Sequence, residues 1–367
     1  MTLLPQERKK LSVTDDRFIP YDEALSGEGE SLDRVRERLQ EQHRDLMEIG
    51  RAARPVFVGI GASHAASALA VYLLRRRGVP AHRVSAGDLP AGTPALGDAV
   101  IGVSQSGRSR ETIDYLLSTE AHKAAVVNVP ASPLTQVAST AVDLGAQRDS
   151  KASTIGFTGT LLALGLLADR WTSPTGAVSQ PVHQGGPSLC EAVGDLEGRS
   201  EPILAQLGET LSSTSTVDVV GHKASVASAE EGALLLREVC RVPAAAFDLR
   251  NYLHGAEESA APTSTAQLIV GRQRGLELAQ TMSDRGLSVS LMTDLPSEAT
   301  ALLRRSGVPV VTLPVVDDTT RVILETVIIQ RLALIIANHK DVAPDEFLAT
   351  SLDTKIDDLA QLGTAPS

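Results

Sequence analysis

The chain of 367 residues is long enough for two domains that each bury a core, and its 43% apolar and 22% charged residues are typical of a soluble globular protein. A net charge of −11 and only 3% aromatic residues argue against binding to nucleic acid or to an anionic membrane. Cys190 and Cys240 are the only cysteines, which excludes a disulfide framework and a thiolate zinc site. The longest apolar run, from Leu161 to Ala168, is too short for a bilayer, and the N-terminus lacks the apolar stretch of a signal peptide, so we expect a cytoplasmic protein without membrane contact.

Residues 1–50 stand apart from the regular pattern that follows them. Residues 1–30 are polar and have few apolar residues at a regular spacing, so we expect an arm that lies over a domain or a partner subunit. From Ser31 to Gly50 the apolar residues recur at roughly helical spacing, which predicts a helix with Ser31 as its N-cap.

A regular alternation of strands and helices begins at Pro55. Short apolar runs predict strands over 56–60, 81–85, 98–103 and 124–129. Helical patterns are present over 63–77, 109–118 and 153–171. Short buried strands separated by helices predict right-handed crossovers and a parallel sheet with helices on both faces.

A segment rich in Gly, Pro, Ser and Thr over residues 172–187 separates this run from a second one. In the second run we expect strands over 217–220, 266–270, 288–292 and 309–313, and helices over 188–211, 222–240, 273–285, 296–305 and 320–338. The chain therefore divides into an arm and helix (1–50), a first domain (51–171), a linker (172–187), a second domain (188–340) and a C-terminal tail (341–367).

The two runs are copies of one another. Residues 59–81 parallel residues 221–244, because each stretch has a strand, a glycine turn, an Ala/Leu-rich helix and a closing Val-Pro-Ala. Further along, residues 101–107 match residues 269–275. The predicted fold class is therefore α/β, with two domains related by internal duplication, each a parallel sheet flanked by helices in three αβα layers.

The stretch from Ser104 to Thr112 follows a predicted strand and opens a predicted helix. The first N–H groups of a helix lack partners within it, and together with the hydroxyls of Ser104 and Ser106 they suit the oxygens of a phosphomonoester. The alternative is a serine-rich N-cap and turn that binds no ligand. In the second copy Arg272 and Arg274 replace the two serines, so only the first domain has these hydroxyl groups.

The first predicted turn reads Gly59-Ile-Gly-Ala-Ser-His64. His64 occupies the position of the third glycine in a dinucleotide fingerprint, which disfavours a nucleotide-dependent oxidoreductase. Ser63 is either the N-cap of the following helix or part of a second wall that faces the Ser104 loop across the switch point of the sheet.

Glu231 and Glu238 are seven positions apart, so they lie on nearly one face of a predicted helix, among apolar residues. A carboxylate in such a place is either paired with an arginine, here Arg237 or Arg241, or has its pKa raised by desolvation, which suits a general base. His254 precedes a glycine, which is typical of the end of a helix. The residues alone leave these alternatives open.

Five short blocks occur in order along the chain: Gly61-Ala-Ser63, Ser104-Gln-Ser-Gly107, Ala152-Ser-Thr154, Glu231-Gly-Ala-Leu-Leu-Leu-Arg-Glu238 and Leu253-His-Gly255. Together they resemble the tandem sugar isomerase (SIS) domain family, which is typified by the isomerase half of glucosamine-6-phosphate synthase. The resemblance runs from about Arg51 to about Leu352, and it implies two SIS-type domains.

The resemblance implies a site for a small-molecule sugar phosphate, without a metal or other cofactor. One set of residues would hold the phosphate: Ser63, Ser104, Gln105, Ser106 and Ser109. A second set matches a block that lines the sugar, and it also opens a predicted helix: Ala152, Ser153 and Thr154. Glu238 matches the carboxylate that moves a proton between C1 and C2 of an open-chain sugar. His254 matches a histidine that assists ring opening from the partner subunit, which implies a homodimer with a shared site.

The chain also departs from the pattern of the family. It begins Met-Thr and has no leading cysteine, so we expect no glutaminase domain and no glutamine amidotransferase activity. Glu346 and Thr350 stand where the family's tail has an arginine and a lysine, and Lys355 or Lys151 could substitute. We therefore expect an aldose–ketose isomerase, or a deaminase or deglycase, that acts on an amino-sugar or fructosamine phosphate of the glucosamine 6-phosphate or fructose 6-phosphate type. The alternative is a non-catalytic sugar-phosphate sensor.

Overall fold

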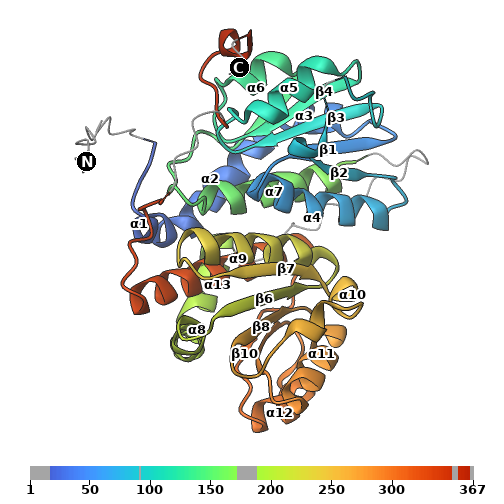
Figure 1. The fold of residues 1–367 in the computed structure, drawn as a ribbon. Helices are drawn as coiled ribbons and strands as arrows, with labels where there is room; N and C mark the ends of the chain where they lie inside the picture. The colour runs from blue at the N-terminus through green and yellow to red at the C-terminus, as the bar shows by residue number, and fades with distance from the viewer. Residues whose placement is uncertain (1–16, 91, 172–187, 349–353, 364–367) are drawn as a thin grey trace, which may run out of the picture.

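The computed structural model describes residues 17–90, 92–171, 188–348 and 354–363 of the chain. Two five-stranded sheets lie one above the other, with helices on both faces of each (Figure 1). Within the described residues every strand pair in the two sheets is parallel. The strand order is β2-β1-β3-β4-β5 in the first sheet and β7-β6-β8-β9-β10 in the second, which is one topology repeated. The expected α/β fold of two duplicated domains is confirmed.

The first domain forms the upper half of Figure 1. Its elements are β1 (Pro55–Gly59), α4 (Ala62–Arg76), β2 (His82–Ser85), η1 (Ala86–Asp88), β3 (Ala99–Ser104), α5 (Arg110–Ser118), β4 (His122–Val127), α6 (Pro133–Val137), β5 (Thr140–Asp143) and α7 (Ile155–Asp169). Every residue of β1 and β3 is buried, as expected for central strands of a parallel sheet. The sequence pattern did not predict α6 and β5, because five and four residues are too few to show a period.

The second domain forms the lower half of Figure 1. Its elements are α8 (Leu189–Ser212), β6 (Thr216–Gly221), η2 (Lys223–Ser225), α9 (Val226–Glu238), β7 (Ala244–Asp248), α10 (Leu249–Tyr252), η3 (Ala256–Ser259), β8 (Thr265–Val270), α11 (Gln273–Asp284), β9 (Ser288–Thr293), α12 (Ser297–Arg305), β10 (Val310–Thr312) and α13 (Asp318–His339). The sequence pattern did not predict β7, because its three alanines carry little strand preference. Within the part of the chain that the structure describes, no helix is both long and apolar enough to cross a membrane.

Three helices precede the first sheet: α1 (Tyr21–Ser26), α2 (Glu28–Glu41) and α3 (His43–Ile49). The expected arm is therefore helical from Tyr21 onward, because Tyr21 and Leu25 are buried and α1 packs on α13. The prediction of Ser31 as an N-cap is wrong, since α2 begins three residues earlier and the Ser31 hydroxyl accepts a hydrogen bond from Arg34 (2.7 Å). The first part of the arm (1–16) and the expected linker (172–187) lie outside the described residues.

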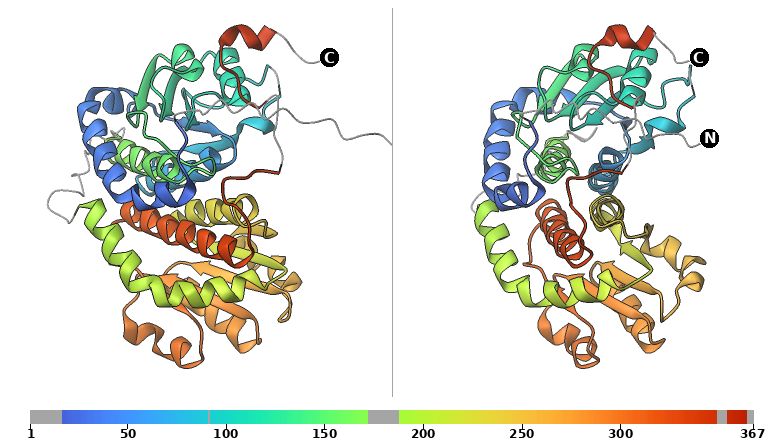
Figure 2. Two further views of the ribbon diagram at one scale, coloured as in Figure 1. Left: turned by 90° about the vertical axis from the view of Figure 1, so that its left-hand side faces the viewer. Right: turned by 60° about the vertical axis from the view of Figure 1, so that its left-hand side comes forward.

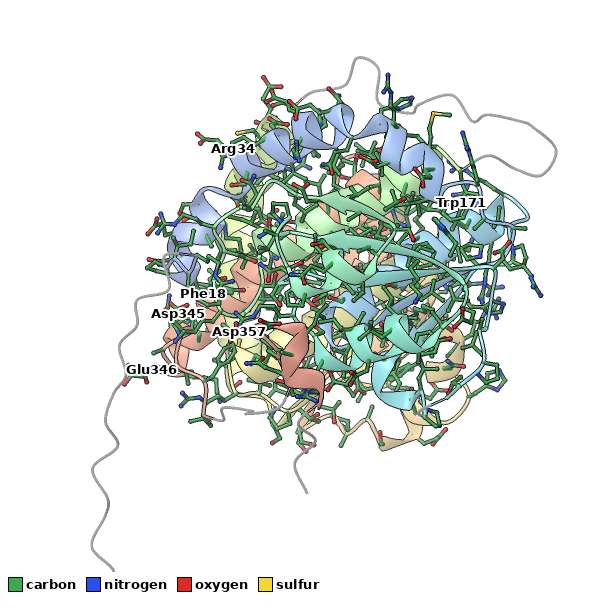
Figure 3. The ribbon with its side chains drawn as sticks, turned by 90° about the horizontal axis from the view of Figure 1, so that it is seen from above. Phe18, Arg34, Trp171, Asp345, Glu346 and Asp357 are labelled. Atoms are coloured by element: carbon green, nitrogen blue, oxygen red, sulfur yellow. The ribbon has the colours of Figure 1, made fainter. Side chains whose placement is uncertain are left out.

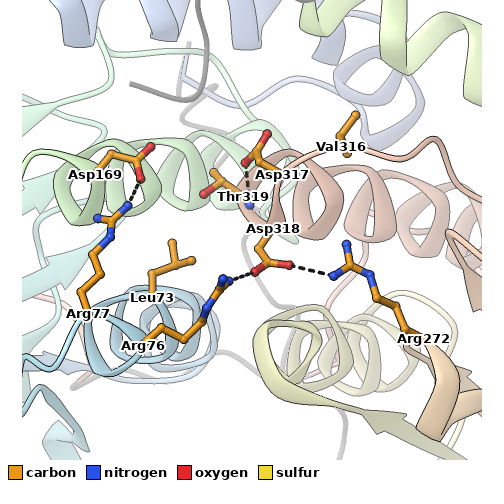
Figure 4. Close-up of a pocket in the computed structure, with 9 residues that line it drawn as sticks. All are labelled: Leu73, Arg76, Arg77, Asp169, Arg272, Val316, Asp317, Asp318 and Thr319. Carbon is orange, nitrogen blue, oxygen red and sulfur yellow. Dashed lines mark hydrogen bonds and ion pairs between the residues drawn. The ribbon is translucent and has the colours of Figure 1, made fainter. Parts of the chain in front are cut away.

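The two domains share one core. Helices α4 and α7 of the first domain pack against α9 and α13 of the second, and the right view of Figure 2 shows all four between the sheets. Gly165 makes part of this approach possible, because a Cβ at that position would lie 2.3 Å from Cγ2 of Thr319. Ion pairs from Arg83 to Glu230 and from Arg76 to Asp318 also join the domains, and the second is drawn in Figure 4.

An acidic side chain is buried in this core. Glu28 is fully buried, and one of its oxygens accepts a hydrogen bond from Oγ1 of Thr158 (2.6 Å). Its other oxygen has no hydrogen-bond partner among the described residues. Burial raises the pKa of Glu28 to about 8, although the hydrogen bond from Thr158 acts in the opposite direction. We therefore expect Glu28 to be protonated in the folded protein at neutral pH.

Replacement of Glu28 should remove a pH dependence of stability. Between pH 4.5 and about 8 the unfolded chain gives up the Glu28 proton and the folded chain keeps it, so the wild type should lose stability as the pH rises. The difference between the two pKa values sets an upper limit of about 5 kcal/mol on this loss. Glu28→Gln keeps an acceptor for Thr158 and does not titrate. Urea unfolding of both proteins across this range should show that the free energy of unfolding of Glu28→Gln increases relative to that of the wild type as the pH rises. A difference between the two free energies that does not change with pH would contradict the assignment.

Candidate functional site

The strands β1 and β3 are parallel neighbours, and from them the chain proceeds in opposite directions across the sheet, from β1 to β2 and from β3 to β4. Such a reversal opens a crevice at the carboxyl ends of the strands, which is where open α/β sheets bind ligands. Residues 60–63 follow β1 and residues 105–109 follow β3. The two loops that were expected to hold a phosphate therefore lie side by side at this crevice.

The loop after β3 is closed tightly by hydroxyl and backbone contacts. The Ser104 side chain is buried, and its Oγ lies 3.0 Å from Oγ of Ser109. Gly107 has a φ of +64°, and a Cβ there would lie 2.0 Å from Oγ of Ser132, so no other residue fits this turn without rearrangement. Gln105 and Ser106 are half-buried beside it. The loop thus has polar side chains at its opening and a backbone fixed by glycine.

Ser63 lies at the neighbouring loop but does not cap its helix. The helix α4 begins at Ala62, and Gly61, with a φ of +56°, is its N-cap residue. The N-cap alternative for Ser63 is therefore wrong, because the glycine turn ends one residue earlier than the pattern indicated. Ser63 is half-buried in the first turn of α4, on the loop beside the one that carries Ser104.

A buried carboxylate, Asp149, organises the block that was expected to line the sugar. It accepts hydrogen bonds from the hydroxyls of Ser153 (2.8 Å) and Thr154 (2.8 Å) and from the N–H groups of Ile155 (3.0 Å) and Gly156 (2.9 Å). Burial raises the pKa of Asp149, and the hydrogen bonds from Thr154 and Ser153 oppose this shift. The block therefore does start a helix, α7, and Asp149 occupies the N-terminus of that helix.

The residues of this block differ in exposure. Ala152 and Thr154 are buried, whereas Ser153 is half-buried and lies at the wall of a cavity. The role of all three toward a sugar stays a prediction. The sequence pattern missed Asp149 because the strand before it, β5, was not recognised. Asp149 also lies six residues before the first residue of α7, outside the N-cap position at which an acidic residue signals a helix start.

A cavity of about 110 Å³ connects the Ser104 loop with the α7 block. Gln105 and Ser106 line it on one side, Ser153 on another and Lys355 on a third. Four cationic side chains contribute to its walls: Arg17, Arg108, Lys151 and Lys355. The predicted phosphate loop and the predicted sugar block therefore line one cavity, whose walls include four cationic side chains.

The C-terminal tail lies directly on the Ser104 loop. Lys355 forms an isolated antiparallel bridge with Ser109. The N–H of Ile356 donates to the carbonyl of Arg108 (3.0 Å), and Arg108 also forms an ion pair with Asp357. In the view from above in Figure 3, Asp357 lies on the same side of the molecule as Phe18, which lines the cavity with Lys355.

The two candidate lysines have different surroundings. Lys151 donates a hydrogen bond through Nζ to the carbonyl of Asp345 (3.1 Å), so its ammonium group faces the tail. Partial desolvation lowers the pKa of Lys355, and the guanidinium groups of Arg108 and Arg17 lower it further, while Glu238 acts in the opposite direction. Lys355 is therefore the lysine that couples the Ser104 loop to Glu238.

Glu238 ends α9 and is exposed, whereas Glu231 on the same helix is buried. Desolvation raises the pKa of Glu238, and Arg237 and Lys355 oppose the shift. Burial raises the pKa of Glu231 well above its ordinary value, and the charge of Glu238 adds to the effect. The salt-bridge alternative is wrong for the described residues, because Arg237 donates to the carbonyl of Ala244 (2.7 Å) and no ion pair of Glu238 is formed.

His254 does not join Glu238 within one chain. It is exposed and follows α10, at the carboxyl end of β7, while Glu238 precedes the opposite end of that strand. Five residues of strand separate the two ends by roughly 16 Å. A contribution of His254 to the same site would have to come from a second subunit.

Comparison with known proteins agrees with this geometry. Residues 48–170 match the family model for the SIS domain, and no curated protein matches the sequence. The C-terminal domain of glucosamine-fructose-6-phosphate aminotransferase from Francisella tularensis is 19% identical with a TM-score of 0.73, over 91% of this chain and 100% of that one. Tagatose-6-phosphate ketose/aldose isomerase from Escherichia coli is 16% identical with a TM-score of 0.67, over 91% of this chain and 96% of that one. Glucosamine-6-phosphate deaminase from Thermotoga maritima is 16% identical with a TM-score of 0.62, over 87% of this chain and 98% of that one. At these identities the similarity establishes the fold, and with the family match it shows that the chain contains a SIS domain at residues 48–170 followed by a second domain of the same fold.

Proposed function

We propose that the chain binds a sugar phosphate at residues 104–109 and moves a proton between C1 and C2 of the open-chain sugar. The observation that carries the proposal is the position of Lys355, which bridges to Ser109 and lies close enough to Glu238 for each charge to shift the pKa of the other. The names of the similar structures, a ketose/aldose isomerase and a deaminase among them, support a substrate of the sugar-phosphate class.

The phosphate would lie at the crevice between the β1 and β3 loops. Its proposed donors are the side chains of Ser63, Ser104, Gln105, Ser106 and Ser109. The N–H of Arg110, the first of α5, already donates to the carbonyl of Thr354 in the tail (3.2 Å), so the helix would contribute the N–H groups that follow it. The sugar would extend into the cavity toward Ser153, with Ala152 and Thr154 buried on either side of that residue in the chain. In this pose C1 and C2 would face Lys355 and Glu238.

Glu238 would act as the general base and Lys355 as the group that stabilises negative charge on oxygen. Removal of the C2 proton of an aldose by Glu238 leaves the C–H electrons to form a C1–C2 double bond, while the carbonyl electrons move to O1. Return of a proton to C1 and loss of the O2 proton gives the ketose. If C2 carries an amine, the same transfer gives an imine, which water hydrolyses to the ketose and ammonia. A raised pKa of Glu238 suits this role, because a base is most effective when its pKa is near the working pH.

His254 of the partner subunit would assist opening of the sugar ring in a homodimer. The support is that His254 is exposed on its own chain and lies beyond reach of Glu238 there. Leu253 beside it is an exposed large apolar residue, which suits a surface that another subunit covers.

A non-catalytic sugar-phosphate sensor is the second candidate. The observation that favours it is Glu346, an exposed acidic residue where the related tails have a basic one. The sensor and the enzyme share the phosphate site and differ only in turnover.

We expect the serines in residues 104–109 to contribute to the affinity for phosphate. Ser104→Ala and Ser106→Ala each remove a donor to a charged ligand, which costs about 1.5–3 kcal/mol, so fructose 6-phosphate should bind roughly 10- to 100-fold more weakly. Ser118→Ala, at the far end of α5, is the matched control and should bind normally. Titration calorimetry measures the three affinities, and unchanged binding in both loop variants would place the phosphate elsewhere.

Glu238→Gln should reduce turnover by about 10²–10⁴-fold and leave phosphate affinity near normal, because the amide cannot take a proton. The assay would follow ammonia release and uptake of solvent deuterium at C1 or C2 with fructose 6-phosphate, glucosamine 6-phosphate and fructosamine phosphates. Turnover at the wild-type rate in the variant would remove Glu238 from the mechanism. Binding of these sugars by the wild type with no exchange in any of them would favour the sensor.

The two lysines should behave differently in the same assay. Lys355→Met should lower turnover, because it removes the cation next to Glu238, whereas Lys151→Met should not, because the Lys151 ammonium group is held by the Asp345 carbonyl. The reverse order of effects would assign the role to Lys151.

A further inference from the structure

The second sheet has a switch point of its own. There β6 and β8 are parallel neighbours, and the chain proceeds from β6 to β7 and from β8 to β9 in opposite directions. The loops after β6 and β8 are also in close contact, because a Cβ on Gly271 would lie 3.5 Å from Cβ of His222. This crevice is the counterpart of the phosphate site in the first domain.

Basic side chains gather around this second crevice. In the sequence Arg272 and Arg274 match Ser104 and Ser106. In the structure Arg272 lies in the loop after β8, and Arg274 lies in the first turn of α11. Lys223 follows β6 in the left-handed region, with a φ of +60°, and its charge acts on His222 at the same end of the sheet. Arg250, in the helix that follows β7, is the fourth.

Only part of this positive charge is neutralised. Arg272 is held by Asp294 (2.7 Å). Within the described parts of the chain Arg274 pairs only with Glu277, and both side chains of that pair are about half exposed, where ion pairs are weak. Lys223 and Arg250 have no ion pair with any residue that the structure describes.

The carboxylate of Asp248 offsets part of this charge. Asp248 accepts hydrogen bonds from the N–H groups of Arg250 (2.9 Å) and Asn251 (3.3 Å), so it serves as the N-cap of α10. No acidic residue stands in the first turn of α11, which contains Arg274. The crevice therefore combines cations whose charge is only partly offset with the first N–H groups of a twelve-residue helix.

His222 lies within this positive field. Its ring is half-buried, and Nδ1 is buried without a hydrogen-bond partner among the described residues. Burial lowers the pKa of His222, Lys223 lowers it further, Asp248 opposes the shift, and Arg250 and Arg274 add to it. An anion that binds beside His222 should therefore raise the pKa of its ring.

We propose that the switch point of the second sheet is a second anion site, which takes a phosphate group through Lys223, Arg250 and Arg274. A phosphate dianion matches the several cations, and a guanidinium can donate two parallel hydrogen bonds to it. The site is separate from the one in the first domain and does not depend on the proposed reaction there.

The cavity between the domains is a different case. It measures about 370 Å³ and contains Arg76, Arg77 and Arg272, but Figure 4 shows each arginine facing an aspartate, Asp318 or Asp169. Its charges are balanced, so an anion would compete there with carboxylates that are already in place.

The His222 ring provides the test in the full-length protein. Its pKa would be measured by NMR in inorganic phosphate and in chloride at equal ionic strength, with His222→Gln to assign the signal. Phosphate should raise the pKa of His222 by about 1, since an opposite charge nearby favours the protonated ring. Lys223→Gln with Arg274→Gln should abolish most of the rise, and Arg305→Gln, a matched exposed arginine on α12, should not.

Ser104→Ala separates the two sites. The His222 response should survive in this variant, even though the first site has lost a donor. An equal pKa of His222 in phosphate and chloride, or a response that disappears in Ser104→Ala, would overturn the inference. Loss of sugar-phosphate binding at residues 104–109 with an intact His222 response would instead contradict only the proposed function.

Discussion

The parallel pairing of β1 with β3 is the constraint on which the site depends. Its register sets Val58 opposite Gly102, so the two strands end at the same edge of the sheet. Because the chain then proceeds in opposite directions, no crossover helix covers the gap between their loops. Serine hydroxyls on one side and a glycine turn on the other can both reach a ligand there. The same pairing occurs between β6 and β8, where arginines replace the serines.

The candidate site has acidic side chains buried beneath it and cationic side chains at its surface. Asp149 and Glu231 lie in the core and have raised pKa values, because burial disfavours their charged forms. Above them, the tail brings Lys355 to the Ser104 loop and within the field of Glu238. The tail thus links the first domain, which would hold the phosphate, to the helix of the second domain that carries the proposed base.

The central features of the fold could be predicted from the sequence, because the strands β1, β3, β6 and β8 are apolar runs bounded by glycine and polar turns. The duplication could be recognised in the sequence because these apolar runs and glycine turns recur in the same order in both halves of the chain. The elements that were missed are short or rich in alanine, as α6, β5 and β7 are. The N-caps proposed for Ser31 and Ser63 were wrong because both helices begin earlier than the apolar pattern indicated, directly after Gly27 and Gly61.

The site was predictable only where it is local. The Ser104 loop follows from a strand, a glycine and a helix start in one short stretch, whereas the contact of Lys355 with Ser109 joins residues that are far apart in the chain. The role of Asp149 at α7 and the separation of His254 from Glu238 also depend on tertiary packing.

A crystal structure of the protein with bound glucosamine 6-phosphate tests the central claim most directly. The account predicts the phosphate at residues 104–109, with C1 and C2 facing Glu238 and Lys355. A saturated crystal in which that loop is empty and the sugar phosphate lies elsewhere would contradict it.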